Sequence, residues 1–491
     1  MKKNEDVKEN KKNKETKEKE EIIGIFNIYT ENIKVYNKFM NDLFSKISKD
    51  NFFFTKKKKK DLLKNMKENV NYLVDFIYNL DEKNNKDIYN CLSTIYGAFL
   101  GDAIGAYCEF KRPNLNNMKL IFVGNPLFGN DPGQVTDDSE MAIASAFALM
   151  DNPEKENINS DYLYYYYGLW HISKPKDEGI TTRKALNIFD IAKFNPMDNN
   201  NYEKEFKIIK KNNNNSLANG FLMRTSPFIV WCYFRYNQKI VNTLKNNNPN
   251  QKELLELFQI IKNQAKKDNI CTHPNDTLSV SHSIFCIMTL GAICELKPNQ
   301  IINIIKLLLK DNYFDNKEII DIKLMIMEEL NNYEKNKSLS QFEYGFQYFT
   351  SKDKSINTHM GFYYHAFRLT LYYLYYFDEI KNEKNFSKYR TIMNQICSFG
   401  GDTDTNAAIV GTVIGPLIGY KYFGKDDLNK MIKLIPNKRF IFSPALMIIY
   451  VYFIKDDKYN NGKFNYNFLK MILSFLFDKI DINNLINIFN I

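Results

Sequence analysis

Two acidic motifs, far apart in the chain, carry oxygen-bearing side chains at spacings that suit metal binding. The first is Thr136-Asp137-Asp138, which follows a glycine-containing loop and opens a stretch rich in alanine and methionine. The second is Asp402-Thr403-Asp404-Thr405, which follows Gly400 and Gly401 and opens another small-residue stretch. Hard oxygen ligands that converge on one point suit Mg²⁺, Mn²⁺ or Ca²⁺. No histidine has a comparable setting, which argues against zinc.

Either motif alone also fits an ordinary helix start. Thr and Asp side chains commonly accept hydrogen bonds from the free N–H groups there, and acids complement the helix dipole. Asp402 or Thr403 suits the N-cap of a helix that begins near Asp404. Asp137 with Glu140 has the spacing of a capping box. The chemistry therefore depends on whether the two motifs meet.

If they meet, four carboxylates gather at one place. Without metal they would repel one another, and some would take up protons. A charge of about −4 balances two divalent cations, and two metal ions about 4 Å apart can activate a water between them. The repeated pattern thus predicts a two-metal centre, with Mg²⁺ or Mn²⁺ as its ions. The predicted oxygen ligands are Thr136, Asp137, Asp138, Asp402, Asp404 and Thr405.

Five further polar positions have both a structural and a functional interpretation. Glu109 precedes two basic residues, so it could be a surface acid paired with them. Asp177-Glu178-Gly179 is an acidic turn before an expected helix. Asn219-Gly220 favours a tight turn whose free N–H groups can cradle phosphate oxygens. Arg224 would bind an anion or, more commonly, a structural carboxylate. His273 would contact a ligand or be a structural histidine.

Helices must position these residues, because very few segments alternate with period two. Gly97, Gly101 and Gly105 would form one smooth stripe on a helix, against which another backbone could pack closely. Asp102, beside the stripe, would be a buried acid bonded to a backbone or to a neighbouring turn. The Asn-rich stretch 194–215 is interpreted as an insertion loop, and residues 236–252 as a second Asn-rich insertion. The sequence therefore predicts an all-α domain with Asn/Lys-rich insertions.

Composition limits the classes of protein that fit. The 491 residues, 44% of them hydrophobic, are enough for one large domain or two to three small ones. The net charge of +10 is local, since Lys56–Lys60 supplies five positive charges, which argues against a nucleic-acid-binding face over the whole protein. Seven scattered cysteines indicate free thiols in a reducing compartment. The N-terminus lacks the apolar segment of a secretory signal, and no stretch reaches about 18 unbroken apolar residues.

Three regions of the chain differ in amino-acid composition. Residues 1–88 form an N-terminal extension, which we expect to be disordered to about residue 21 and helical after it. Residues 89–456 contain all the motifs above and are the expected catalytic domain. Residues 457–491 are an expected C-terminal helical tail. Lys56–Lys60 is a solvated charge run or a nuclear-import patch, so we expect a cytoplasmic protein with nuclear entry as the alternative.

The motifs, in their order, resemble the ADP-ribosylglycohydrolase family, which includes dinitrogenase-reductase-activating glycohydrolases and ADP-ribosyl-arginine and ADP-ribosyl-serine hydrolases. The resemblance covers roughly residues 91–456, and its two acidic motifs together are highly specific. It implies an all-helical orthogonal bundle with a two-metal centre in a cleft, and Mg²⁺ or Mn²⁺ as cofactor. The matching stretches are LGDAIGAYCE, TDDSEMAIA, DEGITT, LANGFLMRTSP, THPN and GGDTDTNAAIVG.

The resemblance also implies roles for single residues. The six oxygen ligands above match the family's metal ligands. Glu109 matches the acid that guards substrate and metal in serine-linkage hydrolases, and Asp177 matches an acid proposed for proton transfer. Glu178 departs from the family pattern, which has an aliphatic residue there. Five positions match residues near the diphosphate and adenosine of the substrate: Ser216, Leu217, Asn219, Gly220 and His273. Gly401 is a further expected substrate-binding residue.

The expected reaction is hydrolysis at C1 of the distal ribose, with release of ADP-ribose from a modified protein side chain or a related conjugate. The metal pair would orient the ribose hydroxyls and activate water. Glu109 or Asp177 would protonate the leaving group. The stretch LANGFLMRTSP resembles arginine-linkage enzymes more than serine-linkage ones, so we expect the arginine linkage.

Two other functions fit the same residues. A non-catalytic ADP-ribose-binding protein would bind the ligand without turnover, and a two-metal phosphohydrolase would release AMP or phosphate. The intact set of acids argues against the first. We expect the partner to be an ADP-ribosylated protein or a small ADP-ribose conjugate, with no stable nucleic-acid binding and no membrane, and we expect a monomer.

Overall fold

The computed structural model describes residues 67, 70–71, 73–119, 122–125, 127–152, 156–190, 203–246, 250–310, 317–335, 340–382, 386–434 and 442–459. This part of the chain is all-helical, as predicted, and contains no named strand. It includes two isolated antiparallel bridges, Lys111 with Gly401 and Ala218 with Phe362. Most of the expected N-terminal extension, Lys56–Lys60 included, and residues 460–491 of the expected tail lie outside the described residues.

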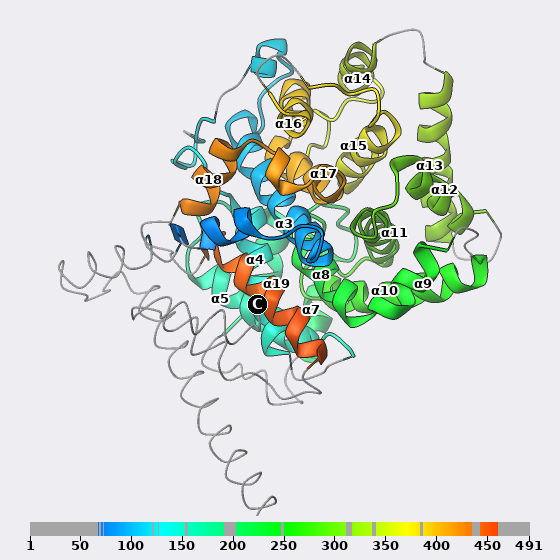
Figure 1. Ribbon diagram of the computed structural model, residues 1–491. Helices are drawn as coiled ribbons and strands as arrows, with labels where there is room; N and C mark the ends of the chain where they lie inside the picture. The colour runs from blue at the N-terminus through cyan, green and yellow to red at the C-terminus, as the bar shows by residue number, and fades with distance from the viewer. Residues whose placement is uncertain are drawn as a thin grey trace, which may run out of the picture.

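The helices of the first half of the chain are α3 to α10 (Figure 1), and the first acidic motif lies at the start of α4. Their bounds are α3 Lys86–Gly105, α4 Asp137–Asp151, α5 Ser160–Ile172, α6 Ile180–Leu186, α7 Glu203–Asn213, α8 Ser226–Arg235, α9 Asn237–Leu244 and α10 Gln251–Asn269. Short 3₁₀ turns lie at Ala106–Cys108 and Leu115–Lys119.

The helices of the second half carry the second acidic motif. Their bounds are α11 Asp276–Ile293, α12 Pro298–Leu308, α13 Lys317–Lys335, α14 Gln341–Thr350, α15 Tyr363–Tyr375, α16 Lys388–Phe399, α17 Thr403–Ile418, α18 Lys425–Lys433 and α19 Leu446–Tyr459. A 3₁₀ turn lies at Tyr420–Tyr422.

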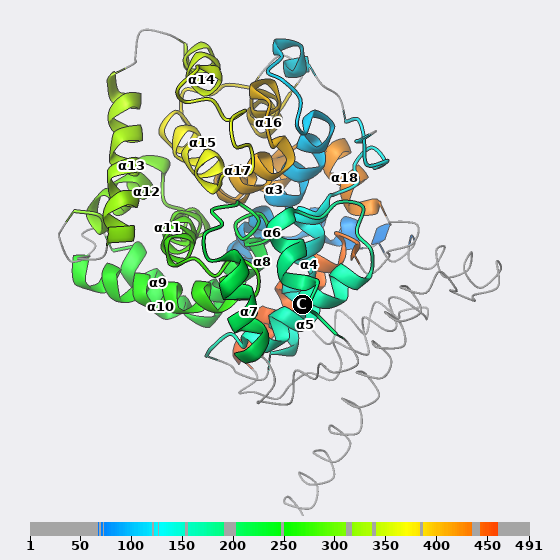
Figure 2. The same ribbon diagram turned by 180° about the vertical axis from the view of Figure 1, so that it is seen from behind.

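The pair α3 and α17 lies at the centre of the molecule in both views, with the other helices around it (Figures 1 and 2). The glycine stripe is the reason that these helices can touch. A Cβ atom on Gly97 would lie 2.3 Å from the carbonyl oxygen of Gly411, and one on Gly101 would lie 2.3 Å from that of Ala407. The predicted close approach of a second backbone is thus confirmed, and its partner is the helix of the second acidic motif.

The Asn-rich stretch 194–215 is not a simple loop, so that prediction is wrong in part, and the second Asn-rich insertion is also partly helical. The helix α7 covers 203–213 and α9 covers 237–244. Each has apolar side chains at helical spacing, Phe206 with Ile209 and Ile240 with Leu244, that pack on the core. Burial of one apolar face outweighs the weak helix propensity of asparagine.

The helix α11 is long and apolar enough to cross a membrane, with a mean hydropathy of 1.3 over Asp276–Ile293. However, 89% of this window is buried within the protein. It therefore packs as a core helix.

Candidate metal centre and substrate cleft

The first acidic motif forms the start of α4. Thr136 is the N-cap residue, and its hydroxyl accepts a hydrogen bond from the N–H of Asp138 at 3.4 Å. A capping box between Asp137 and Glu140 does not form, because the cap lies one residue earlier and Glu140 accepts a bond from Trp170 Nε1 at 3.0 Å. The side chain of Asp137 is therefore free of a capping role.

Buried Asp102 fastens this helix start to α3. Its carboxylate accepts hydrogen bonds from the N–H of Thr136 at 3.0 and 3.1 Å and from the N–H of Ser139 at 3.2 Å. The hydroxyl of Ser139 donates to the same carboxylate. Asp102 thus has the backbone-binding role predicted for it, and it fixes where the first motif lies.

The second motif forms the start of α17, with Asp402 as the N-cap residue. Asp402 makes no side-chain capping bond; its Oδ2 accepts a hydrogen bond from Asn219 Nδ2 at 2.8 Å instead. Gly400 and Gly401 have φ values of +76° and +81°, a region that favours glycine. A Cβ atom on Gly401 would also lie 2.7 Å from the carbonyl oxygen of Ile356. The glycine pair therefore lets the chain turn in a confined space and places the Asp402 carboxylate beside Asn219.

The two helix starts meet at Asp138. Its Oδ2 accepts hydrogen bonds from the hydroxyl of Thr405 at 3.3 Å and from that of Thr136 at 3.2 Å. Asp138 and Thr405 are 267 positions apart in the sequence, yet their side chains are in direct contact. The other oxygen of Asp138, Oδ1, is buried and has no hydrogen-bond partner among the described residues.

Glu109 belongs to the acidic centre. Its residue is 6% exposed, and one carboxylate oxygen from each of Glu109, Asp402 and Asp404 lies within 4.8 Å of the others. The alternative of a surface acid paired with Lys111 and Arg112 is therefore wrong. The bridge between 111 and 401 brings Glu109 there, because it joins the loop after α3 to the glycine turn before α17.

Asn125 is a contributor that the sequence analysis did not name. Its Nδ2 donates a hydrogen bond to Glu109 Oε2 at 3.0 Å, and it is 3% exposed. It lies in a loop with no motif of its own, so only the folded arrangement identifies it.

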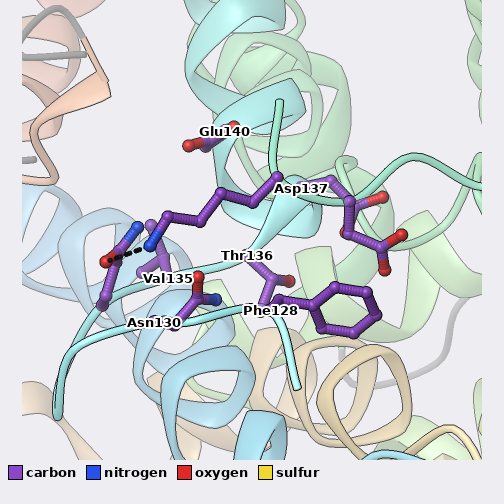
Figure 3. A pocket seen from close by; sticks show the side chains of 9 residues that line it. Phe128, Asn130, Val135, Thr136, Asp137 and Glu140 are labelled. Carbon is purple, nitrogen blue, oxygen red and sulfur yellow. Dashed lines mark hydrogen bonds between the residues drawn. The ribbon is translucent and has the colours of Figure 1, made fainter. Parts of the chain in front are cut away.

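Asp137 and Asp177 both line a small pocket. Figure 3 labels Asp137 among the side chains around this pocket. The empty space at the pocket is about 240 Å³, part of which is open solvent. Its lining residues are Phe128, Asn130, Gln134, Val135, Thr136, Asp137, Glu140, Lys176 and Asp177. Asp177 is only partly buried, so it stands at the edge between the acidic centre and solvent.

Burial makes ionisation of these acids costly. It raises the pKa of Asp137, Asp138 and Asp404 well above the usual range, and the neighbouring carboxylates raise it further. For Glu109, burial and then the charges of Asp402, Asp177 and Asp137 raise the pKa to about 9. Buried carboxylates that lie this close together ionise readily only when a positive charge compensates them.

The donor set fits divalent hard cations. Every side chain in it offers oxygen, three carboxylates converge within 4.8 Å, and Asp138 Oδ1 is a buried acceptor that nothing occupies among the described residues. Oxygen-only sites of this kind suit Mg²⁺ or Mn²⁺ rather than zinc.

The residues expected near the diphosphate and adenosine fall into two groups. Asn219, Gly220 and His273 lie together, since a Cβ on Gly220 would lie 3.0 Å from His273 Cε1. Ser216 and Leu217 are on the approach to this turn: the Ser216 hydroxyl bonds that of Thr181 at 2.8 Å, and Leu217 is 37% exposed.

Arg224 takes the structural role of the two considered. It is fully buried, and one guanidinium nitrogen lies 3.4 Å from Asp268 and 2.8 Å from the hydroxyl of Thr272. Thr272 in turn bonds His273 Nδ1 at 2.8 Å. Burial keeps the pKa of His273 well below its usual range, so this ring is neutral.

The comparison with protein-family models identifies one family for this chain. The family model for ADP-ribosylglycohydrolase matches residues 85–431. A protein of Acanthamoeba polyphaga mimivirus, provisionally named an ADP-ribosyl glycohydrolase, is 26% identical over 340 residues, which are 66% of this chain and 86% of that protein. A solved structure described as an ADP-ribosylglycohydrolase-related protein complex covers 75% of this chain and 99% of its own, at 17% identity and a TM-score of 0.44.

Proposed function

The chain belongs to the ADP-ribosylglycohydrolase family, and on that premise we propose that it hydrolyses the bond between ADP-ribose and arginine side chains of modified proteins, with divalent metal. Family membership itself supports a glycohydrolase; the linkage, the metal and the residue roles are our proposal. The observation that carries it is the meeting of both acidic helix starts at Asp138, with Glu109 beside them.

The oxygen-bearing side chains of this centre would hold the cations. When bound, two divalent ions at such a site supply a water of lowered pKa and orient the hydroxyls of a sugar. The protein's part is to keep the carboxylates converged, which Asn219 does for Asp402 and Asn125 does for Glu109. The proposed set of ligands is Thr136, Asp137, Asp138, Asp402, Asp404 and Thr405, with Glu109 added from its position.

Asp177 is the proposed proton donor. In the reaction, a water oxygen bonds to C1 of the distal ribose and the bond from C1 to the guanidine nitrogen breaks. Asp177 gives its proton to that nitrogen, and the proton that the water loses restores the acid. Burial raises the pKa of Asp177, so a proton is held there more readily than on an ordinary aspartate. Its partly exposed place at the edge of the centre suits contact with a protein side chain that enters from solvent.

The pocket beside Asp177 supports the arginine linkage. Carboxylates of Asp137, Glu140 and Asp177 line it, and Asn130 adds a buried Oδ1 that has no hydrogen-bond partner among the described residues. Lys176 lines it too, but its ammonium donates to the carbonyl of Gly129 at 2.5 Å. A guanidinium carries five N–H donors and a charge that acceptors of this kind match. A serine leaving group, neutral and small, would leave most of them unused.

A panel of defined linkages tests the proposal. Peptides that carry ADP-ribose on arginine or on serine are incubated with the protein and Mg²⁺, Mn²⁺ or EDTA, and the products are identified by mass spectrometry. We expect free ADP-ribose from the arginine peptide, and none in EDTA. AMP would show a phosphohydrolase, and tight binding without turnover would show an ADP-ribose-binding protein. Full activity after Asp402→Ala combined with Asp404→Ala would refute the site.

A further inference from the structure

Glu178, where the chain departs from the family pattern, is not a surface acid. Its residue is 8% exposed, and its carboxylate is held from two sides. Oε1 lies 2.7 Å from His171 Nδ1, in the last turn of α5, and Oε2 accepts a bond from Arg183 Nε, on α6, at 3.2 Å. Arg183 also donates to the backbone carbonyl of Glu178 at 3.0 Å. We call these three residues the Glu178 clamp.

The clamp is one of two anchors on the loop that carries Asp177. On the other side, Lys176 Nζ donates to the carbonyl oxygen of Gly129 at 2.5 Å and to Gln134 Oε1 at 3.3 Å. Asp177 stands between these anchors, and its Oδ1 accepts the N–H of Glu178 at 2.7 Å. The loop is therefore tied to α5 and α6 through one neighbour of Asp177 and to the loop before α4 through the other.

We propose that Glu178 is a positioning residue, which aims the carboxyl group of Asp177 at the leaving group by clamping its loop to His171 and Arg183. The inference rests on the proposed function, in which Asp177 protonates the departing nitrogen. A displacement of about 1 Å in a catalytic group can cost about 100-fold in rate. An aliphatic residue at 178 could not accept either bond, so the loop of such a protein would need another anchor.

The main test compares two leaving groups in Glu178→Ala. Arginine-linked ADP-ribose needs a proton on the departing nitrogen, whereas an ADP-ribosyl conjugate of 4-nitrophenol departs as a stable anion. We expect kcat on the arginine substrate to fall about 10- to 100-fold, with KM within about twofold. On the nitrophenyl conjugate we expect a loss below about threefold. Glu178→Gln, which keeps an acceptor for Arg183, should recover most of the rate.

Coupling to Asp177 is the second part of the test. If Glu178 acts through Asp177, then Asp177→Asn combined with Glu178→Ala will be no slower than Asp177→Asn alone. Should Glu178→Ala fail to fold, Arg183→Ala cuts the clamp at its more exposed member, whose side chain is 54% exposed, and undergoes the same two-substrate comparison.

Glu329→Ala is the matched control. Glu329 is also a buried acid, 1% exposed, and accepts hydroxyl bonds from Tyr333 at 3.0 Å and Tyr348 at 2.9 Å among α13–α15. It should lose stability without favouring either substrate. Equal losses on both substrates in the Glu178 variants, or additive effects with Asp177→Asn, would overturn the positioning role while the proposed function stands. A wild-type protein that cleaves neither substrate would overturn both.

Discussion

At the scale of single residues, the acidic centre is a set of charges held together against their own repulsion. Asp138 and Asp404 are each 1% exposed, and burial is the first cause of their raised pKa values. Polar neighbours offset only part of this cost, since Asp138 Oδ1 accepts no bond from the described residues. The centre is thus less stable without cations than a neutral cluster of the same shape would be.

The variant Asp404→Asn separates metal binding from fold stability. Removal of one buried charge should leave the midpoint of thermal unfolding in EDTA unchanged or raised by a few degrees. The increase that Mg²⁺ gives the wild-type protein should disappear, because that increase depends on a ligand that binds only the folded state. Hydrolysis should fall at least about 100-fold. Differential scanning fluorimetry with and without Mg²⁺ measures the first two effects.

Asp276→Asn is the control for that change. Asp276 is a half-exposed acid at the start of α11, paired with Lys266 at 2.9 Å and distant from the centre in sequence. In the Asp276→Asn protein, Mg²⁺ should raise the midpoint of thermal unfolding as much as it does in the wild-type protein. If Mg²⁺ also raised the unfolding midpoint of the Asp404→Asn protein by the same amount, the Asp404 carboxylate would not contribute to cation binding.

The raised pKa of Glu109 predicts that the stability of the protein depends on pH. The folded protein raises the pKa of Glu109 from 4.5 to about 9, so between these values the folded state binds more protons than the unfolded state. The free energy of unfolding of the metal-free protein should therefore decrease as pH rises through this window. Mg²⁺ should reduce the decrease, because cations stabilise the ionised carboxylates.

Thermal unfolding in EDTA from about pH 5.5 to about pH 9 measures this slope. Glu109→Gln should make the slope less steep, since the glutamine does not titrate, while the other buried acids with raised pKa values keep the slope negative. A wild-type protein whose midpoint rose across the same range without metal would contradict the expected sign of the pH dependence.

At the scale of elements, the packing of α3 against α17 decides where the acids lie. The two helices touch through backbone, because glycine and alanine leave nothing between them. The contact extends to the last residue of α3 and the first residue of α17, where the Thr403 hydroxyl donates to the carbonyl oxygen of Gly105 at 2.7 Å. The start of α17 is thereby fixed beside the loop of Glu109, while Asp102 fixes the start of α4 from the same helix. One helix, α3, therefore positions both acidic motifs.

Gly101→Ala tests this element directly. Alanine has the higher helix propensity by about 1 kcal/mol, which would stabilise an unconstrained helix. At this position its Cβ would lie 2.3 Å from the backbone carbonyl oxygen of Ala407, and backbone cannot move aside cheaply. We expect the collision to dominate, with a net loss of about 1–3 kcal/mol in the free energy of unfolding by urea.

The control for this prediction is Gly179→Ala, where a Cβ would meet nothing within 4 Å. Its free energy of unfolding should change by less than about 0.5 kcal/mol. If both glycine variants were equally stable, the close backbone contact would not be a constraint on the fold.

At the scale of the whole molecule, the core is continuous, and all seven cysteines of the sequence are buried in it as free thiols. Burial raises the pKa of the Cys232 and Cys286 thiols well above the usual range, so little thiolate forms at neutral pH. This agrees with the predicted absence of paired cysteines. Buried thiols of this kind react only when the structure opens.

Thiol titration measures how well the folded protein protects its buried cysteines from solvent. With Ellman's reagent at neutral pH, the native protein should release almost no thionitrobenzoate within minutes, and the protein in guanidinium should release about seven equivalents. Reduction beforehand should not change either number. Rapid reaction of several thiols in the native protein would show that the core opens readily.

The sequence alone determined the helical class, the turns at the glycine pairs and the two groups of acids. These follow from local physics: helical spacing of apolar residues, the conformational freedom of glycine, and the preference of Thr and Asp for helix starts. It also contained the glycine stripe, although not the identity of the helix that packs there. The roles of the acids as metal ligands remain predictions.

Only the tertiary structure decided which acids share a site. Glu109 has an ordinary sequence setting beside two basic residues, and Asn125 has no motif at all, yet both reach the centre because the loop after α3 pairs with Gly401. Likewise, only the tertiary structure shows that Glu178 is bound by His171 and Arg183. The physical reason is that local preferences act over a few residues. The distance between two carboxylates far apart in the chain is instead set by which helices pack together and how closely their backbones approach.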